Sequence, residues 1–387
     1  MTDAGSAPGG PRLVKRLLPS RRMRVGVRVG AVVCAFIVAA LFLLLTGRSV
    51  ASVFETMWEG SFGTAYGQAQ TILAAVPLIF TGLAVAIAFR MRLWNIGAEG
   101  QFYLGAFGAT AVAYAWPEWP ATLLLPAMVA GGMAGGAAWS LVPAVLRARL
   151  GINEIVPTLL LNYVGILLVD YMVHGPWSDP QSLGFPLGKP FSGSATLPAL
   201  GNTAVHAGAI LAVGAALVIS LILRRTTWGY RVRVIGENER AARYAGFSIG
   251  RNVVAIMLLA GALAGVGGMV EVSGVVHKIQ ANISPGFGYT GIIVATLARF
   301  SPLVVVPVAL LFGALIVAGN ELQTVGLPSD IVLMLQAVIL LFALAGELLV
   351  QYRIQWRPGA SEAETPAELS EAELQAAASG SPSIEAG

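Results

Sequence analysis

The sequence predicts an all-α polytopic membrane protein with about ten transmembrane helices, and three observations support this. The chain has 387 residues, of which 56% are hydrophobic and only 11% charged, and its mean hydropathy is +0.75. Soluble domains are about 45–50% apolar and about 25% charged, so an ordinary cytosolic enzyme, a nucleic-acid-binding protein and a disordered protein are excluded. The apolar residues also form runs close to the roughly 20 residues that a helix needs to cross a hydrocarbon core.

Ten apolar runs are the candidate spans. They cover residues 29–47, 69–89, 98–116, 121–142, 153–173, 205–223, 252–273, 287–299, 301–320 and 328–350. The first run follows a basic stretch, as a signal peptide does. It is longer than the apolar part of a signal peptide, and no small-residue cleavage site precedes Arg48, so we expect a retained span. Cys34 lies in this run and is expected to pack between helices.

The eighth run differs from the others in length. A helix over its 13 residues reaches only about 20 Å at 1.5 Å per residue. Pro302 follows shortly after this run and removes a helical hydrogen bond. We therefore expect residues 287–299 to form a short helix, a tilted helix or part of a broken helix.

The distribution of basic residues predicts the orientation. Ten crossings leave both termini on one side, together with 21 of the 24 lysines and arginines; only Arg48, Lys189 and Lys278 lie on the other side. If the eighth run does not cross, the ratio falls to 18 against 6. The positive-inside rule therefore places both termini in the cytoplasm.

Three regions follow from this orientation: a basic cytoplasmic tail (1–28), a transmembrane domain (29–350) and an acidic cytoplasmic tail (351–387). The residues after Arg357 include six glutamates and no aromatic side chain, so we expect this tail to be disordered. The Gly-, Pro- and Ser-rich loop 174–204 lies on the outer side. It is either a cover across the mouth of the helix bundle or a spacer.

The sequence lacks the residues that several classes of transporter and enzyme require. A P-loop needs Gly-Lys followed by Ser or Thr, and none of Lys15, Lys189 and Lys278 is followed by either residue. No span has a charge in its central third, where an ion-coupled carrier would place one. Three histidines and one cysteine provide neither a metal centre nor a clustered acid-base set for a membrane-embedded enzyme. We expect no cofactor, and a pore driven by a separate motor fits better than an ion-coupled secondary carrier.

The cytoplasmic loop 224–251 contains seven arginines. Residues 239–245 read as a short amphipathic helix, which Asn238 caps and Gly246 ends. The loop is either a positive-inside anchor with a surface helix or a docking site for a cytoplasmic subunit. In the second interpretation the small residues Ala241 and Ala242 sit in the partner and the arginines lie at the rim. A purely structural membrane partner would not need such a loop.

Two further segments place polar residues at or within the predicted membrane boundary. Asn95 and Glu99 are four residues apart and are expected to share a helix face at the start of the third span, close to Gln101. Asn153 and Glu154 lie at the inner boundary of the fifth span. Asn162 and Tyr163 fall near its middle, and Gln336 has a similar position in the last span. Such polar groups either bond neighbouring helices or meet a polar solute. The glycines expected to serve close helix packing alone are Gly131, Gly132, Gly135, Gly136, Gly261 and Gly265.

The sequence resembles the permease subunits of bacterial ABC importers for branched-chain amino acids, ribose and nucleosides. Residues 94–101 (WNIGAEGQ) are similar to the family's third-span motif, residues 234–246 to its coupling loop, and residues 286–295 (GFGYTGIIVA) to its late Gly-rich span. The resemblance extends from about residue 60 to 350. The amino-acid sequence of the first motif is most similar to that of the longer permease of nucleoside or simple-sugar importers.

This resemblance implies a type II-like importer bundle that works in a complex. The implied partners are an ABC ATPase subunit with two nucleotide-binding domains, a second homologous permease, an extracellular solute-binding lipoprotein and membrane lipids. The implied location is a bacterial cell membrane, and no nucleic acid is implied. Nucleosides are the implied solutes, with simple sugars as the alternative. The implied ATPase-coupling residues are Gly236, Glu237, Asn238, Arg240, Ala241, Ala242, Arg243 and Gly246. The candidate pathway residues are Asn95, Glu99, Gln101, Tyr103, Asn153, Glu154, Asn162, Tyr163 and Gln336.

Overall fold

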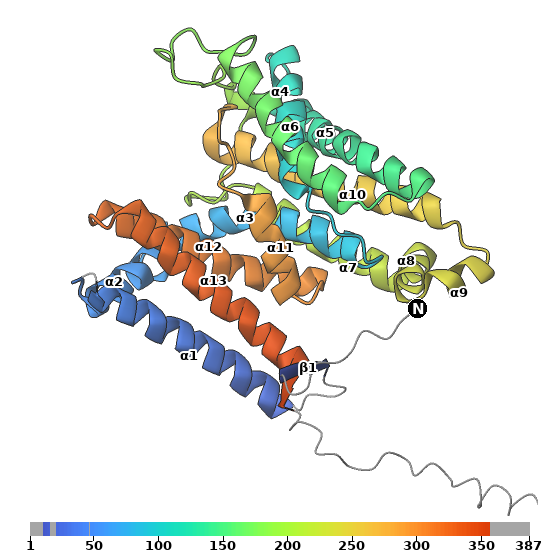
Figure 1. The fold of residues 1–387 in the computed structure, drawn as a ribbon. Coiled ribbons are helices and arrows are strands. Elements are labelled where there is room, and N and C mark those ends of the chain that lie inside the picture. The colour runs from blue at the N-terminus through green and yellow to red at the C-terminus, as the bar shows by residue number, and fades with distance from the viewer. Residues whose placement is uncertain (1–10, 16–20, 46, 357–387) are drawn as a thin grey trace, which may run out of the picture. The chain divides into compact units, whose positions relative to one another are not determined.

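The computed structural model describes residues 11–15, 21–45 and 47–356, which fall into two units. One unit combines the stretches 1–33 and 345–387, and the other comprises 34–344. The elements (Figure 1) are β1 (Pro11–Lys15), α1 (Arg21–Leu45), α2 (Val50–Trp58), η1 (Glu59–Gly63), α3 (Ala65–Phe89), α4 (Ala98–Ala115), α5 (Ala121–Leu150), α6 (Ile155–His174), η2 (Gly193–Ala195), α7 (Gly208–Arg225), α8 (Thr227–Glu237), α9 (Glu239–Tyr244), α10 (Ile249–Glu271), η3 (Val272–Val276), α11 (Phe287–Leu297), α12 (Pro302–Thr324), α13 (Ser329–Gln351) and β2 (Tyr352–Trp356).

The smaller unit contains both strands. β1 and β2 pair antiparallel, with Pro11 opposite Trp356 and Lys15 opposite Tyr352. This pairing was not predicted from the sequence, because it joins two tails more than 300 residues apart in the chain. The acidic segment expected to be disordered begins just past β2, and its residues 357–387 lie outside the described part of the chain.

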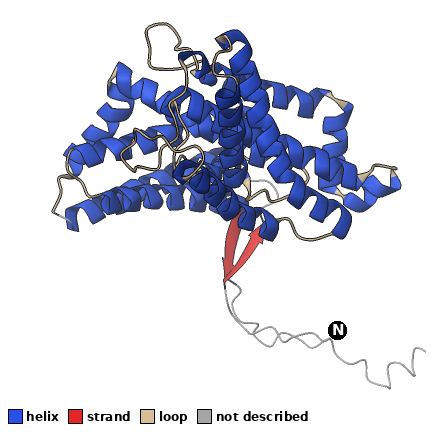
Figure 2. Cartoon of the chain, turned by 90° about the horizontal axis from the view of Figure 1, so that it is seen from above, coloured by secondary structure: helices blue, strands red, loops and turns tan. Residues whose placement is uncertain are grey.

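Helices joined by loops make up the larger unit (Figure 2), and a helix coincides with each of the ten predicted spans. Within the described residues, six helical stretches are long and apolar enough to cross a bilayer: α3, α5, α6, α7, α10 with η3, and α12. Shorter apolar stretches occur at Val33–Leu45, Phe287–Leu297 and Ser329–Ile339. The chain is therefore a multi-pass helical membrane protein.

Helices α3 and α10 form the centre of the larger unit and are buried along most of their length. Helices α4, α5 and α10 lie side by side (Figure 1), and glycines make this approach possible. A Cβ on Gly136 would overlap the backbone of Gly261, and one on Gly265 would overlap that of Gly132. The prediction that these glycines pack helices together is confirmed. Cys34, in contrast, is exposed, so its expected packing role within this chain is wrong.

Helices α4 and α11 both begin inside the bundle after irregular segments. The N–H of Gly100, in the first turn of α4, lies beside Asn162. Asn162 is seven residues into α6, or about 10 Å along its axis. Helix α11 has only 11 residues, which corresponds to about 16 Å, and the irregular stretch 277–286 precedes it. Of the three forms expected for the eighth run, the structure shows the short helix.

The loop that follows α6 is fixed to the bundle. Gly188 N–H donates to Ile279 O at 2.7 Å, Phe191 N–H donates to His277 O at 2.9 Å, and the Ser273 hydroxyl donates to Ala195 O at 2.6 Å. The loop therefore covers one end of the η3 region, and it is not a free spacer. Near its end His206 is buried, and burial lowers its pKa to about 4, with a smaller contribution from His277.

Candidate functional site

The arginine-rich loop 224–251 folds into two helices. The Thr226 hydroxyl accepts the Gly229 N–H at 3.0 Å and begins α8. The Asn238 side chain accepts the Ala241 N–H at 3.0 Å and begins α9, as its predicted role as N-cap requires. Helix α8 was not predicted, although the sequence of the loop contains a signal for it. Trp228, Val232 and Ile235 recur at the i, i+4, i+7 spacing of an amphipathic helix.

Gly246 ends α9 in a Schellman motif. Its φ is +78°, a left-handed conformation that favours glycine. The Phe247 N–H donates to Ala242 O and the Gly246 N–H donates to Arg243 O, both at 3.0 Å, which satisfies two carbonyls at the helix end. The predicted end of this helix is therefore confirmed.

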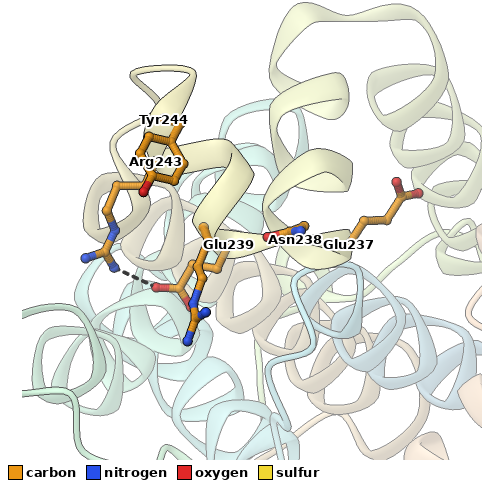
Figure 3. A pocket seen from close by; sticks show the side chains of 6 residues that line it. Glu237, Asn238, Glu239, Arg243 and Tyr244 are labelled. Carbon is orange, nitrogen blue, oxygen red and sulfur yellow. Dashed lines mark hydrogen bonds and ion pairs between the residues drawn. The ribbon is translucent and has the colours of Figure 1, made fainter. Parts of the chain in front are cut away.

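Helix α9 buries Ala242 and exposes the surface formed by its other residues. Tyr244 is 94% exposed, and Arg240, Ala241 and Arg243 are also exposed. Figure 3 shows the pocket around this face, with Arg243 joined to Glu239 and Glu237 pointing away from that pair; the Arg243–Glu239 distance is 2.9 Å. Ala242 is fully buried in the hydrophobic core of the chain. The prediction that Ala242 sits in a partner is therefore wrong, because its methyl group already packs inside this subunit.

Two glycines allow α8 to pack closely against the ends of α3 and α7. A Cβ on Gly236 would overlap the carbonyl oxygen of Arg90, the residue that follows α3. A Cβ on Gly229 would lie 2.5 Å from Ile222 O, near the end of α7. The predicted coupling residue Gly236 thus makes a backbone contact within the subunit rather than an exposed one.

The predicted pathway residues near the start of α4 form a buried polar cluster. Asn95 and Gln101 are 1% exposed, and their side-chain amides exchange two hydrogen bonds at 2.9 Å. Asn95 lies in the irregular segment before α4, so the expectation that it shares a helix face with Glu99 is wrong. The helix begins only at Ala98.

Glu99 joins α4 to α11. Its side chain is buried, and Oε2 accepts the Gly288 N–H at 2.6 Å in the first turn of α11. A carboxylate at this position is favourable, because the first N–H groups of a helix lack partners and the N-terminal end of the helix dipole is positive. One turn further along α4, Tyr103 is also buried, and its hydroxyl accepts the Ser284 N–H at 3.5 Å. The Ser284 hydroxyl in turn accepts the Phe287 N–H at 2.9 Å.

Asn162 in α6 and Glu154, which directly precedes α6, complete this cluster. The Asn162 side chain accepts the Gly100 N–H at 2.8 Å, donates to Ile96 O at 2.8 Å and donates to the Tyr289 hydroxyl at 3.2 Å. Glu154 accepts the Trp94 N–H at 2.9 Å and lies 3.4 Å from Arg147. The side-chain oxygens and nitrogens of this cluster therefore bind partners within the subunit and hold α4, α6 and α11 together.

The three remaining pathway candidates, Asn153, Gln336 and Tyr163, make none of this cluster's hydrogen bonds among the described residues. Asn153 is exposed, and its Oδ1 accepts the Ile155 N–H at 3.0 Å. Gln336 is half-buried and donates to Leu315 O of α12 at 3.1 Å. Tyr163 is 60% exposed on α6, where lipid, a partner subunit or a solute can reach it. A role for any of these residues in solute passage stays a prediction.

Sequence reasoning missed the long-range partners Arg147, Ser284, Gly288 and Tyr289. Ser284-Pro285-Gly286 before an apolar run was a local signal for the start of a helix, but nothing local linked it to Glu99. Among the residues that the structure describes, no group of three or more His, Cys, Asp or Glu side chains could hold a metal ion.

Comparison with known proteins gives consistent matches. The family model described as "Branched-chain amino acid transport system / permease component" matches residues 67–344. The chain is 35% identical to a glucose ABC transporter permease protein of Haloferax volcanii, over 85% of this chain and 89% of the relative. It is 35% identical to a guanosine ABC transporter permease protein of Bacillus subtilis (81% and 90%). It is 30% identical to a nucleoside ABC transporter permease protein of Lactococcus lactis (84% and 91%).

Proposed function

The chain belongs to the family of branched-chain amino acid transport-system permease components, and from this membership we propose that it forms half of the translocation pathway of an ATP-driven importer of nucleosides. The observation that carries the choice of solute is its similarity, over most of its length, to permeases named for guanosine and nucleoside transport. The equally similar glucose permease makes simple sugars the alternative solute.

The proposed partners are a separate ATPase subunit with two nucleotide-binding domains, a second homologous permease and an extracellular solute-binding lipoprotein. The exposed face of α9 supports a docking role, because it presents Arg240, Ala241, Arg243 and Tyr244 at the surface of the chain. In this proposal the ATPase hydrolyses ATP, and this chain has no nucleotide site of its own. Stoichiometric binding of a nucleotide analogue by the purified chain would contradict that assignment.

The contacts of α8 and α9 suggest how motion of the ATPase reaches the membrane. Ala242 fixes α9 to the subunit core, and Gly236 fixes α8 to the carbonyl of Arg90. Arg90 begins the irregular segment that leads to α4, whose first turn holds Glu99 and therefore α11. A displacement of α9 would thus be passed to the inner starts of α4 and α11 through backbone contacts rather than through flexible side chains.

We also propose ten crossings in a bacterial plasma membrane, with both termini in the cytoplasm. The placement of 21 of 24 lysines and arginines on one side supports this orientation. For the eighth crossing, the irregular stretch 277–286 and α11 together supply the length that α11 lacks. A reporter that works only in the cytoplasm should be active when it is fused after Arg357. If instead a reporter that works only outside the cell is active at this position, the topology is overturned.

The decisive experiment measures uptake of labelled guanosine and labelled glucose into vesicles that contain the complete complex. ATP-dependent uptake of guanosine, competed by other nucleosides but not by glucose, is expected. ATP-dependent uptake of glucose alone would replace nucleosides by simple sugars and leave the permease assignment intact. ATP-independent uptake of either solute would contradict the proposed mechanism.

A further inference from the structure

Three arginines converge on one pocket at the ends of four helices. The pocket has a volume of about 180 Å³ and is lined by Arg90 after α3, Arg224 near the end of α7, and Arg233 on α8; Pro302, the first residue of α12, completes one wall. All of these helix ends lie where α3, α7 and α12 leave the predicted membrane core. The pocket therefore lies at a membrane surface.

The backbone of α8 holds Arg233 in this pocket. Gly229, Arg233 and Gly236 are four and three residues apart and so share one face of α8. Gly229 packs on the carbonyls that end α7, and Gly236 packs on the carbonyl of Arg90. The guanidinium of Arg233 lies 3.5 Å from Leu223 O. The face of α8 between the two glycines therefore brings Arg233 beside Arg90 and Arg224.

These three guanidinium groups have no acidic partner among the described residues. The ion pairs in that part of the chain join Arg147 to Glu154, His174 to Asp170 and Arg243 to Glu239. The Nε of Arg90 is buried and has no hydrogen-bond partner. Burial, and repulsion by Arg233 and Arg224, lower the pKa of Arg90. The N-terminal end of α12, with its positive dipole end, adds to the positive potential of the pocket.

We propose that this arginine pocket binds a phosphate group, supplied by an anionic phospholipid of the adjoining leaflet or by free phosphate. A phosphate matches the observations, because guanidinium groups bind its oxygens in paired hydrogen bonds. It would also neutralise three like charges and satisfy the buried Nε of Arg90. Basic pockets between helices at a membrane surface are typical sites for anionic lipid head groups. The inference goes beyond the proposed transport function and does not depend on the identity of the solute.

The test uses the full-length chain in neutral detergent and follows thermal unfolding and binding of short-chain phosphatidylglycerol. The variants are Arg90→Gln and Arg233→Gln. Arg225→Gln is the matched control, because Arg225 neighbours Arg224 and is exposed but does not line the pocket. Phosphatidylcholine and inorganic phosphate are the comparison probes.

Phosphatidylglycerol should raise the unfolding midpoint of the wild type and of Arg225→Gln, while phosphatidylcholine should not. Its dissociation constant should rise about tenfold in Arg90→Gln and Arg233→Gln, which corresponds to about 1.4 kcal/mol. Without any anion, Arg90→Gln should unfold no lower than the wild type, because the substitution removes repulsion between guanidinium groups. Inorganic phosphate that gives the same shift and competes with the lipid would identify free phosphate as the source.

Three results would overturn the proposal. Equal lipid affinity in all variants would mean that phosphatidylglycerol binds elsewhere through general charge attraction. A lower midpoint of Arg90→Gln, equal in size with and without anionic lipid, would show that Arg90 only supports the fold. An unfolding midpoint that shifts on addition of the ATPase subunit, but not of lipid or phosphate, would indicate that a protein carboxylate binds in the pocket. This result would also refute the inference.

Discussion

Replacing Asn162 with leucine separates a structural role from a solute-binding role for this residue. The side chain is fully buried and bonds Gly100 N–H and Ile96 O, both at 2.8 Å. Leucine has a similar size but leaves both backbone groups without a partner, and each such buried group costs about 1–3 kcal/mol. The added apolar contacts offset part of this loss. We expect the free energy of unfolding to fall by about 3 kcal/mol, roughly 150-fold in the unfolding equilibrium.

The assay is unfolding of the purified chain in detergent, combined with uptake by the reconstituted complex. Tyr163→Leu is the matched control, because the adjacent Tyr163 is 60% exposed and exposed substitutions usually change stability by less than about 0.5 kcal/mol. A variant Asn162→Leu that keeps wild-type stability but raises the KM for solute would refute the structural reasoning. Such a result would place the side chain in the translocation pathway instead.

Three further predictions concern the coupling loop and the loop before α7. Ala242→Trp should lower the unfolding midpoint, because overpacking a buried site costs about 1–3 kcal/mol. Ala241→Trp should leave the midpoint unchanged and weaken pull-down of the ATPase. The opposite pattern would mean that the buried and exposed positions of α9 are misassigned. Gly246→Val should abolish ATP-driven uptake and leave expression intact, because a β-branched residue at φ +78° is strained by about 1–2 kcal/mol; normal uptake by this variant would remove the end of α9 from the coupling mechanism. His206 has a folded-state pKa of about 4, below its unfolded value of about 6.5, so the unfolded chain binds a proton first as the pH falls. Stability should therefore decrease by up to about 3 kcal/mol between pH 6.5 and pH 4, and a wild-type pH profile of the unfolding midpoint identical to that of His206→Gln would contradict this.

Local signals predicted the parts of the fold that depend on neighbouring residues in the sequence. Asn238 and Gly246 mark the start and the end of α9, because capping needs only side-chain and backbone groups within a few residues. Long apolar runs likewise marked the positions of the ten matching helices. The pairing of Pro11 with Trp356 could not be predicted, since neither short segment has a pattern that selects the other.

The candidate site was less predictable, because its contacts join distant segments. The polar character of Asn95, Glu99 and Asn162 was evident from the sequence, but their partners were not. Helical spacing suggested that Asn95 and Glu99 share a helix face, whereas the chain reaches α4 through an irregular segment and Asn95 pairs with Gln101. The six residues of α9 were too few to show which alanine faces inward.

The buried starts of α4 and α11 have a consequence for how the protein is made. Glu99 meets its partner Gly288 across 189 residues of sequence, so α4 leaves the ribosome long before the segment that binds its carboxylate. Until then, an ionised side chain in the hydrocarbon interior would be costly, and the Glu99 carboxylate would lack the Gly288 N–H as its partner. We expect α4 to remain near the aqueous boundary during synthesis and to take its final depth only when α11 arrives. Insertion of this protein would then end with a late joint rearrangement of two helices, rather than proceed strictly one span at a time.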